Sequence, residues 1–146
     1  MLHVTYEAVD KPDRIAVVDE ERGKVRIAVD KTAPLDVVVR ELNTEFERFL
    51  AAADWFQLWH TGEIVSRGTP DSPLGVVFII DPLQPVGTEI QERRGLVSIL
   101  IHPGLTTEEF VAAMNPAVDK FLARGCWFQH YAGEIIDMSP EPMSKV

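Results

Sequence analysis

Cysteine is almost absent from this sequence, since Cys126 is the only one among 146 residues. A single cysteine excludes an intramolecular disulfide, and no cysteines or histidines have the spacing of a zinc site. The longest apolar runs, among them Val76–Ile80, are far too short to span a bilayer. The first ten residues contain neither a basic segment nor an apolar core. We therefore expect no signal peptide, no membrane partner and a cytoplasmic protein.

Catalytic and cofactor-binding signatures are also lacking. The sequence has no P-loop, no glycine-rich dinucleotide fingerprint, and no GxSxG or HExxH segment. Cys126 and His130 are four residues apart in a predicted strand, which separates them by about 13 Å and excludes a nucleophile–base pair. Glu63 and Glu134 follow glycines in corresponding turns, where exposed positions explain them more simply than a paired carboxylate site. The sequence therefore favours a protein without enzymatic activity, catalytic residues, metal ligands or cofactors.

Basic residues are in the minority. Lysine and arginine number 14 against 23 acidic residues, giving a formal net charge of −9. The excess of acidic residues is spread over both halves of the chain rather than held in a tail. The electrostatic field of these acidic residues repels nucleic acid and favours a basic partner. The alternative is that the negative charge only keeps the protein soluble. We expect no nucleic acid among the partners.

One phrase occurs twice. Residues 49–64 read FLAAADWFQLWHTGEI and residues 121–135 read FLARGCWFQHYAGEI, an offset of 72 residues (121 minus 49). The same offset aligns Val25 with Val97 and Asn43 with Asn115. Self-similarity at a fixed period is the signature of a structural repeat. We predict one domain, residues 1–146, made of two tandem repeats (about 1–72 and 73–138) with pseudo-twofold symmetry and a short loose C-terminal tail.

Each repeat shows the same series of patterns. Alternating and short apolar segments predict strands, and apolar residues at three- and four-residue steps predict one helix. In the first repeat the predicted strands are 3–9, 15–19, 24–30, 54–59 and 63–67, with a helix at 32–53. In the second they are 74–81, 86–91, 96–102, 126–131 and 134–137, with a helix at 106–124. We predict an α+β fold of two β-β-β-α-β-β units, in which an antiparallel sheet has two helices packed on one side. One shared sheet and a barrel both remain open.

The second repeat is more apolar than the first on one strand face. Its residues Val77, Ile79, Leu96 and Leu100 stand where the first repeat has Thr5, Glu7, Lys24 and Ala28. A strand that is apolar on both faces must be covered on both. The cover is either another part of this chain or an intermolecular contact, in a homodimer or with another protein. We hypothesise that these four residues form a protein-binding interface.

Aromatic residues and glutamines alternate at a second candidate site. On one face of each corresponding strand stand Trp55, Gln57 and Trp59, and Trp127, Gln129 and Tyr131. Such a row could hold a planar ligand or a sugar in a pocket at the junction of the repeats, but packing in the core explains it more simply. A small-molecule binder or modest enzyme is therefore the alternative to a protein-binding module.

The central stretch resembles one protein family. Its sequence reads WFQLW at residues 55–59, TPDSP at 69–73 and VVFI at 76–79. This order is similar to the Trp-Leu-Gln-x-Trp opening, Thr-x-Asp-Asn-Pro turn and alternating strand of small immunity proteins from bacterial polymorphic-toxin systems. Leu74 and Gly75 replace the glycine and tryptophan expected after the turn, and the family's aspartate-rich linker is missing.

The resemblance implies a small, acidic, cytoplasmic protein that occludes a toxin without catalysis of its own. A toxin nuclease of this kind is usually basic, so the net charge of −9 would speed encounter. From the sequence we predict a non-enzymatic binding module whose partner is another protein, such as a basic toxin, or a second copy of itself.

Overall fold

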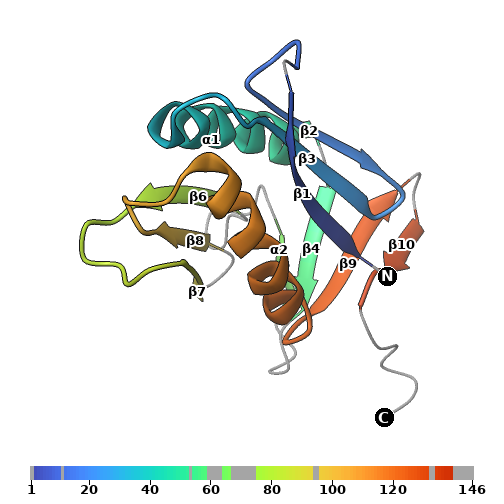
Figure 1. Ribbon diagram of the computed structural model, residues 1–146. Coiled ribbons are helices and arrows are strands. Elements are labelled where there is room, and N and C mark those ends of the chain that lie inside the picture. Colours follow the sequence, from blue (N-terminus) through green and yellow to red (C-terminus); the bar gives the residue numbers. More distant parts are fainter. Residues whose placement is uncertain are drawn as a thin grey trace.

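The computed structural model describes residues 2–10, 12–52, 54–58, 64–66, 75–93, 96–131 and 134–139 (Figure 1). The description covers only the backbone at residues 52, 54–58, 64–66, 93, 126, 128–131 and 135. Most of the predicted tail, residues 140–146, lies outside it.

Strands and helices follow one another in the same order in both halves of the chain. The first half contains β1 (His3–Val9), β2 (Ala16–Glu21), β3 (Lys24–Asp30), α1 (Leu35–Ala52), β4 (Asp54–Leu58) and β5 (Ile64–Ser66). The second half contains β6 (Gly75–Ile80), β7 (Thr88–Arg93), β8 (Leu96–Ile101), α2 (Thr107–Leu122), β9 (Cys126–Tyr131) and β10 (Glu134–Asp137). The predicted α+β class is confirmed.

The hairpin between β2 and β3 is tighter than the sequence suggested. Glu21 pairs with Lys24, so only Arg22 and Gly23 form the turn. Their φ angles are 48° and 84°. Two successive positive φ angles are what a two-residue turn between right-twisted strands requires, and glycine adopts them without steric cost. Strand β2 therefore extends to Glu21, two residues beyond the predicted strand end at residue 19.

The described strands form three sheets, with orders β1-β3-β2, β6-β8-β7 and β10-β9-β4-β5. The prediction that the sheet is antiparallel is wrong for two pairs of strands. Strand β1 pairs with β3 in parallel, and β6 pairs with β8 in parallel. In the first half, β2 and β3 form a hairpin, and β1 pairs with the free edge of β3. In the second half, β7 and β8 pair in the same way, and β6 pairs with the free edge of β8. Alternating patterns reveal which face of a strand is buried, but they do not reveal which strand is its neighbour.

The two helices lie between the three-stranded sheets rather than together on one side of a single sheet (Figure 1). Helix α1 contacts β2 of its own half and β6 of the other half. Helix α2 contacts β7 of its own half and β1 of the other half. Each helix therefore covers the sheet of its own half and also runs beside the edge strand of the opposite half.

A single apolar core joins these layers. The largest fully buried side chains come from both halves: Ile27, Val29, Val38, Leu42, Ile101, Phe110 and Met114. The apolar stripes of the two helices face this core, as their spacing predicts. Helix α2 begins with a capping box, in which Thr106 Oγ1 accepts from the Glu109 N–H and the Glu109 carboxylate accepts from the Thr106 N–H.

The four-stranded sheet joins the halves through β4 and β9, which run antiparallel. Phe56 pairs with Phe128, the residue 72 positions later (128 minus 56). On either side, Trp55 pairs with Gln129 and Gln57 pairs with Trp127. A twofold axis between the two phenylalanines would exchange these two pairs.

Neither α1 nor α2, the helices of the described chain, is long and apolar enough to cross a membrane.

Candidate functional site

The outer face of the β6-β8-β7 sheet carries the four aliphatic residues that the sequence singled out. The register sets Ile79 opposite Leu100 and Val77 opposite Ser98. Leu96 pairs with Gly75, where an added Cβ would lie 3.3 Å from Leu96 Cδ1. Val77, Ile79, Leu96 and Leu100 therefore share one face of two neighbouring strands, as the interface hypothesis requires.

This aliphatic face is open to solvent within the described chain. Ile79 is 40% exposed and Leu96 is 49% exposed, while Val77 and Leu100 are half-buried. The opposite face of the same strands packs into the core through Phe78, Val97, Ile99 and Ile101, all of which are buried. On β7, the residues beside the aliphatic face include Glu89 and Gln91, both exposed. The aliphatic face thus has a rigid backing and a polar border.

The corresponding face of the first half has a different chemistry. Arg26, on β3, donates to Glu7 of β1 and forms an ion pair with it at 2.7 Å. The counterparts of these two residues in the second half are Ser98 and Ile79. The same backbone therefore carries a charged pair across its strands in one half and an uncharged serine and isoleucine in the other.

Two further exposed aliphatic residues were missed by the sequence analysis. Leu83 and Val86, in the loop between β6 and β7, are 90% and 81% exposed. Leu83 lies in the proline-rich segment DPLQPVG, where no periodicity marks it, and Val86 begins the predicted strand 86–91, whereas β7 begins at Thr88. The available signal was two isolated apolar residues in a segment of otherwise turn-forming composition.

The junction residues are brought together in part. Trp55, Gln57, Trp127 and Gln129 occupy neighbouring positions of β4 and β9. Tyr131 lies at the end of β9, opposite Glu134. Trp59 and Glu63 fall outside the described residues.

The side chain of Trp127 is committed to the core. It is 6% exposed, and its Nε1 donates to the Leu122 carbonyl at 3.0 Å. Its ring lies 5.7 Å from the ring of Phe121. The indole N–H, the polar group with which a tryptophan would bind a ligand, therefore already has a partner.

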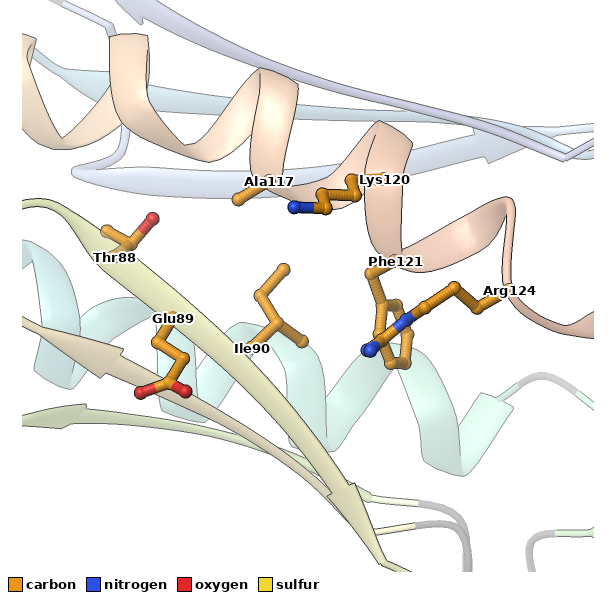
Figure 2. A pocket seen from close by; sticks show the side chains of 7 residues that line it. All are labelled: Thr88, Glu89, Ile90, Ala117, Lys120, Phe121 and Arg124. Carbon is orange, nitrogen blue, oxygen red and sulfur yellow. The ribbon is translucent and has the colours of Figure 1, made fainter.

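A pocket of about 260 Å³ lies elsewhere, between β7 and the C-terminal part of α2 (Figure 2). Ile90 and Phe121 supply apolar walls, and Lys120 and Arg124 extend from the helix side (Figure 2). The remaining lining residues are Thr88, Glu89 and Ala117. The Thr88 hydroxyl is buried and has no hydrogen-bond partner among the described residues. The sequence analysis did not find this pocket.

Groups of three or more side chains able to hold a metal ion do not occur among the described residues. No family model, no curated protein and no solved structure matches this chain. The resemblance of residues 55–79 to immunity proteins therefore stays a prediction.

Proposed function

We propose that this chain is a non-enzymatic protein-binding module that contacts its partner through Val77, Ile79, Leu96 and Leu100. The observation that carries the proposal is the exposure of Ile79 and Leu96, at 40% and 49%, on a sheet whose opposite face is buried. Scattered exposed aliphatic residues need no explanation, but these four are contiguous on two paired strands. Contiguous apolar surface with a polar border is typical of a protein interface.

The contrast with the first half supports this role. If the fold itself required aliphatic residues on the outer face, both halves would carry them. The first half instead has Glu7, which is ion-paired with Arg26, at the position of Ile79. The aliphatic residues of the second half therefore answer a demand beyond the architecture that the halves share, and contact with another molecule is such a demand.

We propose a basic protein, rather than a second copy of this chain, as the partner. Two copies would each bring a formal net charge of −9, and that repulsion opposes self-association. The same charge would accelerate encounter with a basic protein. A cytoplasmic immunity protein that occludes a basic toxin fits these requirements, as the resemblance of residues 55–79 implies.

We also propose that the two halves arose by tandem duplication and are related by a pseudo-twofold axis. Three observations support this. The sheets β1-β3-β2 and β6-β8-β7 have the same order and the same pairing directions. The β4–β9 register is symmetric about Phe56 and Phe128. Each helix contacts the edge strand of the opposite half.

The alternative, a small-molecule binder or modest enzyme with a pocket at the junction, has less support. The β4–β9 register sets Trp55 beside Gln129 and Gln57 beside Trp127, which favours a shared site. The Trp127 indole, however, is buried and bonded to the Leu122 carbonyl. We therefore rank this function second.

The proposal predicts that a gene next to that of this chain encodes a basic toxin domain, and the test is binding of the purified chain to that purified domain. Analytical ultracentrifugation would compare the wild type, an Ile79→Lys/Leu96→Lys double variant and a Thr5→Lys control on the corresponding face of the first half. We expect the complex to form with the wild type and the control but not with the double variant. Equal binding by all three would overturn the proposal, and self-association of the wild type alone would assign the face to a homodimer.

A further inference from the structure

The pocket between β7 and α2 occupies a place that the first half fills with its own carboxylate. Ala117, which lines the pocket, corresponds to Glu45 (117 minus 72). Glu45 is buried, with 7% of its surface exposed. Its carboxylate bonds the Arg14 guanidinium and lies 3.2 Å from Arg48 Nη1. Shortening this position to alanine removes the carboxylate and leaves space in the second half.

The cation that would face such a carboxylate is still present. Lys120 corresponds to Arg48, and Arg124, at the position of Ala52, adds a second positive charge. Neither cation forms an ion pair within the part of the chain that the structure describes. The Arg124 guanidinium lies 5.6 Å from the centre of the Phe121 ring instead. Both charges are thus available to an anion that enters the pocket.

The two cations outweigh the negative charges at the pocket itself. The C-terminal end of α2 contributes roughly half a negative charge, which one cation outweighs. Glu89 lines the pocket but extends from β7 on the side away from α2 (Figure 2). Two cations on the helix side therefore favour one carboxylate between them.

The rest of the lining is suited to an apolar body. Ile90, Ala117 and Phe121 present carbon atoms, and Phe121 is itself buried against Trp127. On the strand side, the Thr88 hydroxyl is a buried polar atom without a hydrogen-bond partner within the described residues. A volume of about 260 Å³ is below the roughly 300–1,000 Å³ of pockets for drug-sized ligands. The occupant is therefore small.

We propose that this pocket binds a small apolar carboxylate, whose charged end meets Lys120 and Arg124 and whose body lies between Ile90 and Phe121. The ligand takes the place of the carboxylate that Glu45 provides in the first half. A free aliphatic or aryl acid and the C-terminus of a peptide ending in an apolar residue share this chemistry. The inference is independent of the proposed interface, because Thr88 and Ile90 face α2 whereas the aliphatic face points away from it.

Titration with 3-phenylpropanoate tests the proposal, with 3-phenylpropan-1-ol as the neutral probe of matched shape. Methyl resonances of Ile90 and Ala117 in two-dimensional NMR spectra report occupancy. A short peptide ending in phenylalanine, with either a free or an amidated C-terminus, distinguishes the two sources. We expect saturable shifts with the acid, and with the free-ended peptide if a chain terminus is the natural ligand, but not with the alcohol or the amide.

Three variants of pocket residues and one control variant test where the acid binds. Lys120→Gln and Arg124→Gln should each weaken binding of the acid by about tenfold or more, because each removes a charge-assisted contact. Ala117→Glu should abolish it by rebuilding the internal carboxylate, with melting temperature and circular dichroism showing that the variant folds. Arg40→Gln, which removes an exposed cation of α1 outside the pocket, should leave binding unchanged.

Three outcomes would overturn the proposal. Equal shifts with acid and alcohol would mean that the pocket is merely an apolar hollow. No saturable shift with the acid or the free-ended peptide at millimolar concentrations would mean that it holds solvent. Retained binding in the folded Ala117→Glu variant would place the acid elsewhere on the protein and would refute the site.

Discussion

The side chain of Asn115, in α2, bonds both backbone polar groups of Tyr6, in β1. Its Oδ1 accepts from the Tyr6 N–H at 2.8 Å, and its Nδ2 donates to the Tyr6 carbonyl at 3.0 Å. Asn43, in α1, makes the same two bonds to Phe78, in β6, at 2.7 and 3.0 Å. Since β1 and β6 are edge strands, each asparagine supplies the donor and acceptor that a further strand would have provided.

These bonds should contribute strongly to stability. We expect Asn115→Ala and Asn43→Ala each to lower the free energy of unfolding by about 2–4 kcal/mol, because two hydrogen bonds are lost and two backbone groups lose their partners. Urea denaturation measures the loss. Thr44→Ala, which removes only an exposed hydroxyl bonded to the Arg40 carbonyl, should change stability by less than about 0.5 kcal/mol. A small effect at one asparagine and a large one at the other would contradict equivalent roles.

The two faces of β8 should respond differently to substitution. Leu96→Lys should change the free energy of unfolding of the free protein by less than about 0.5 kcal/mol, because Leu96 is 49% exposed. Ile99→Ala should lower it by about 2–5 kcal/mol, because Ile99 is 3% exposed and its removal leaves a cavity. Urea denaturation of both variants decides the matter. Unfolding of the Leu96→Lys variant would show that the aliphatic face is core rather than interface.

Local features of this fold could be read from the sequence because they depend on neighbouring residues. The apolar stripe of α2 is set by steps of three and four residues. The shared face of Val77, Ile79, Leu96 and Leu100 follows from strand alternation once the halves are aligned. These predictions needed no knowledge of which elements pack together.

The remaining features depend on long-range packing, which residue spacing does not encode. Sequence alignment pairs Asn43 with Asn115 but does not reveal that each binds the opposite half. The parallel pairing of β1 with β3 depends on which side of a hairpin the first strand joins. The pocket was missed because its signal is a lost side chain, alanine at position 117 in place of glutamate. The loss of this carboxylate becomes recognisable only when Glu45, its counterpart in the first half, is found to be buried and bonded to arginine.

Gly104 and His102 should be coupled. The Gly104 N–H donates to His102 Nδ1 at 2.9 Å, and a Cβ on Gly104 would lie 2.7 Å from His102 Cε1. Gly104→Ala should therefore displace the imidazole and lower stability by about 1 kcal/mol through the lost hydrogen bond. In a His102→Ala background the same substitution should have less effect, because the ring is already gone. A double-mutant cycle measures the coupling, and strictly additive effects would show that the contact does not matter.

Tyr6 should make the protein sensitive to alkali. Burial raises the pKa of the Tyr6 hydroxyl, because its anion would be deprived of water. A folded-state pKa above the unfolded value of about 10 means that the folded protein retains a proton that the unfolded chain releases. The stability that depends on this proton is fully present below about pH 10 and falls above it, by up to about 1.4 kcal/mol per pH unit.

Tyr6→Phe removes this dependence while keeping the ring, whose centre lies 6.3 Å from that of Phe110 in an edge-to-face contact. We expect the stability difference between variant and wild type to be constant from pH 7 to about pH 10, and to shift in favour of the variant at higher pH. Urea denaturation across this range measures the difference, and groups that titrate alike in both proteins cancel from it. Parallel curves above pH 10 would show that the Tyr6 hydroxyl reaches water in the folded state.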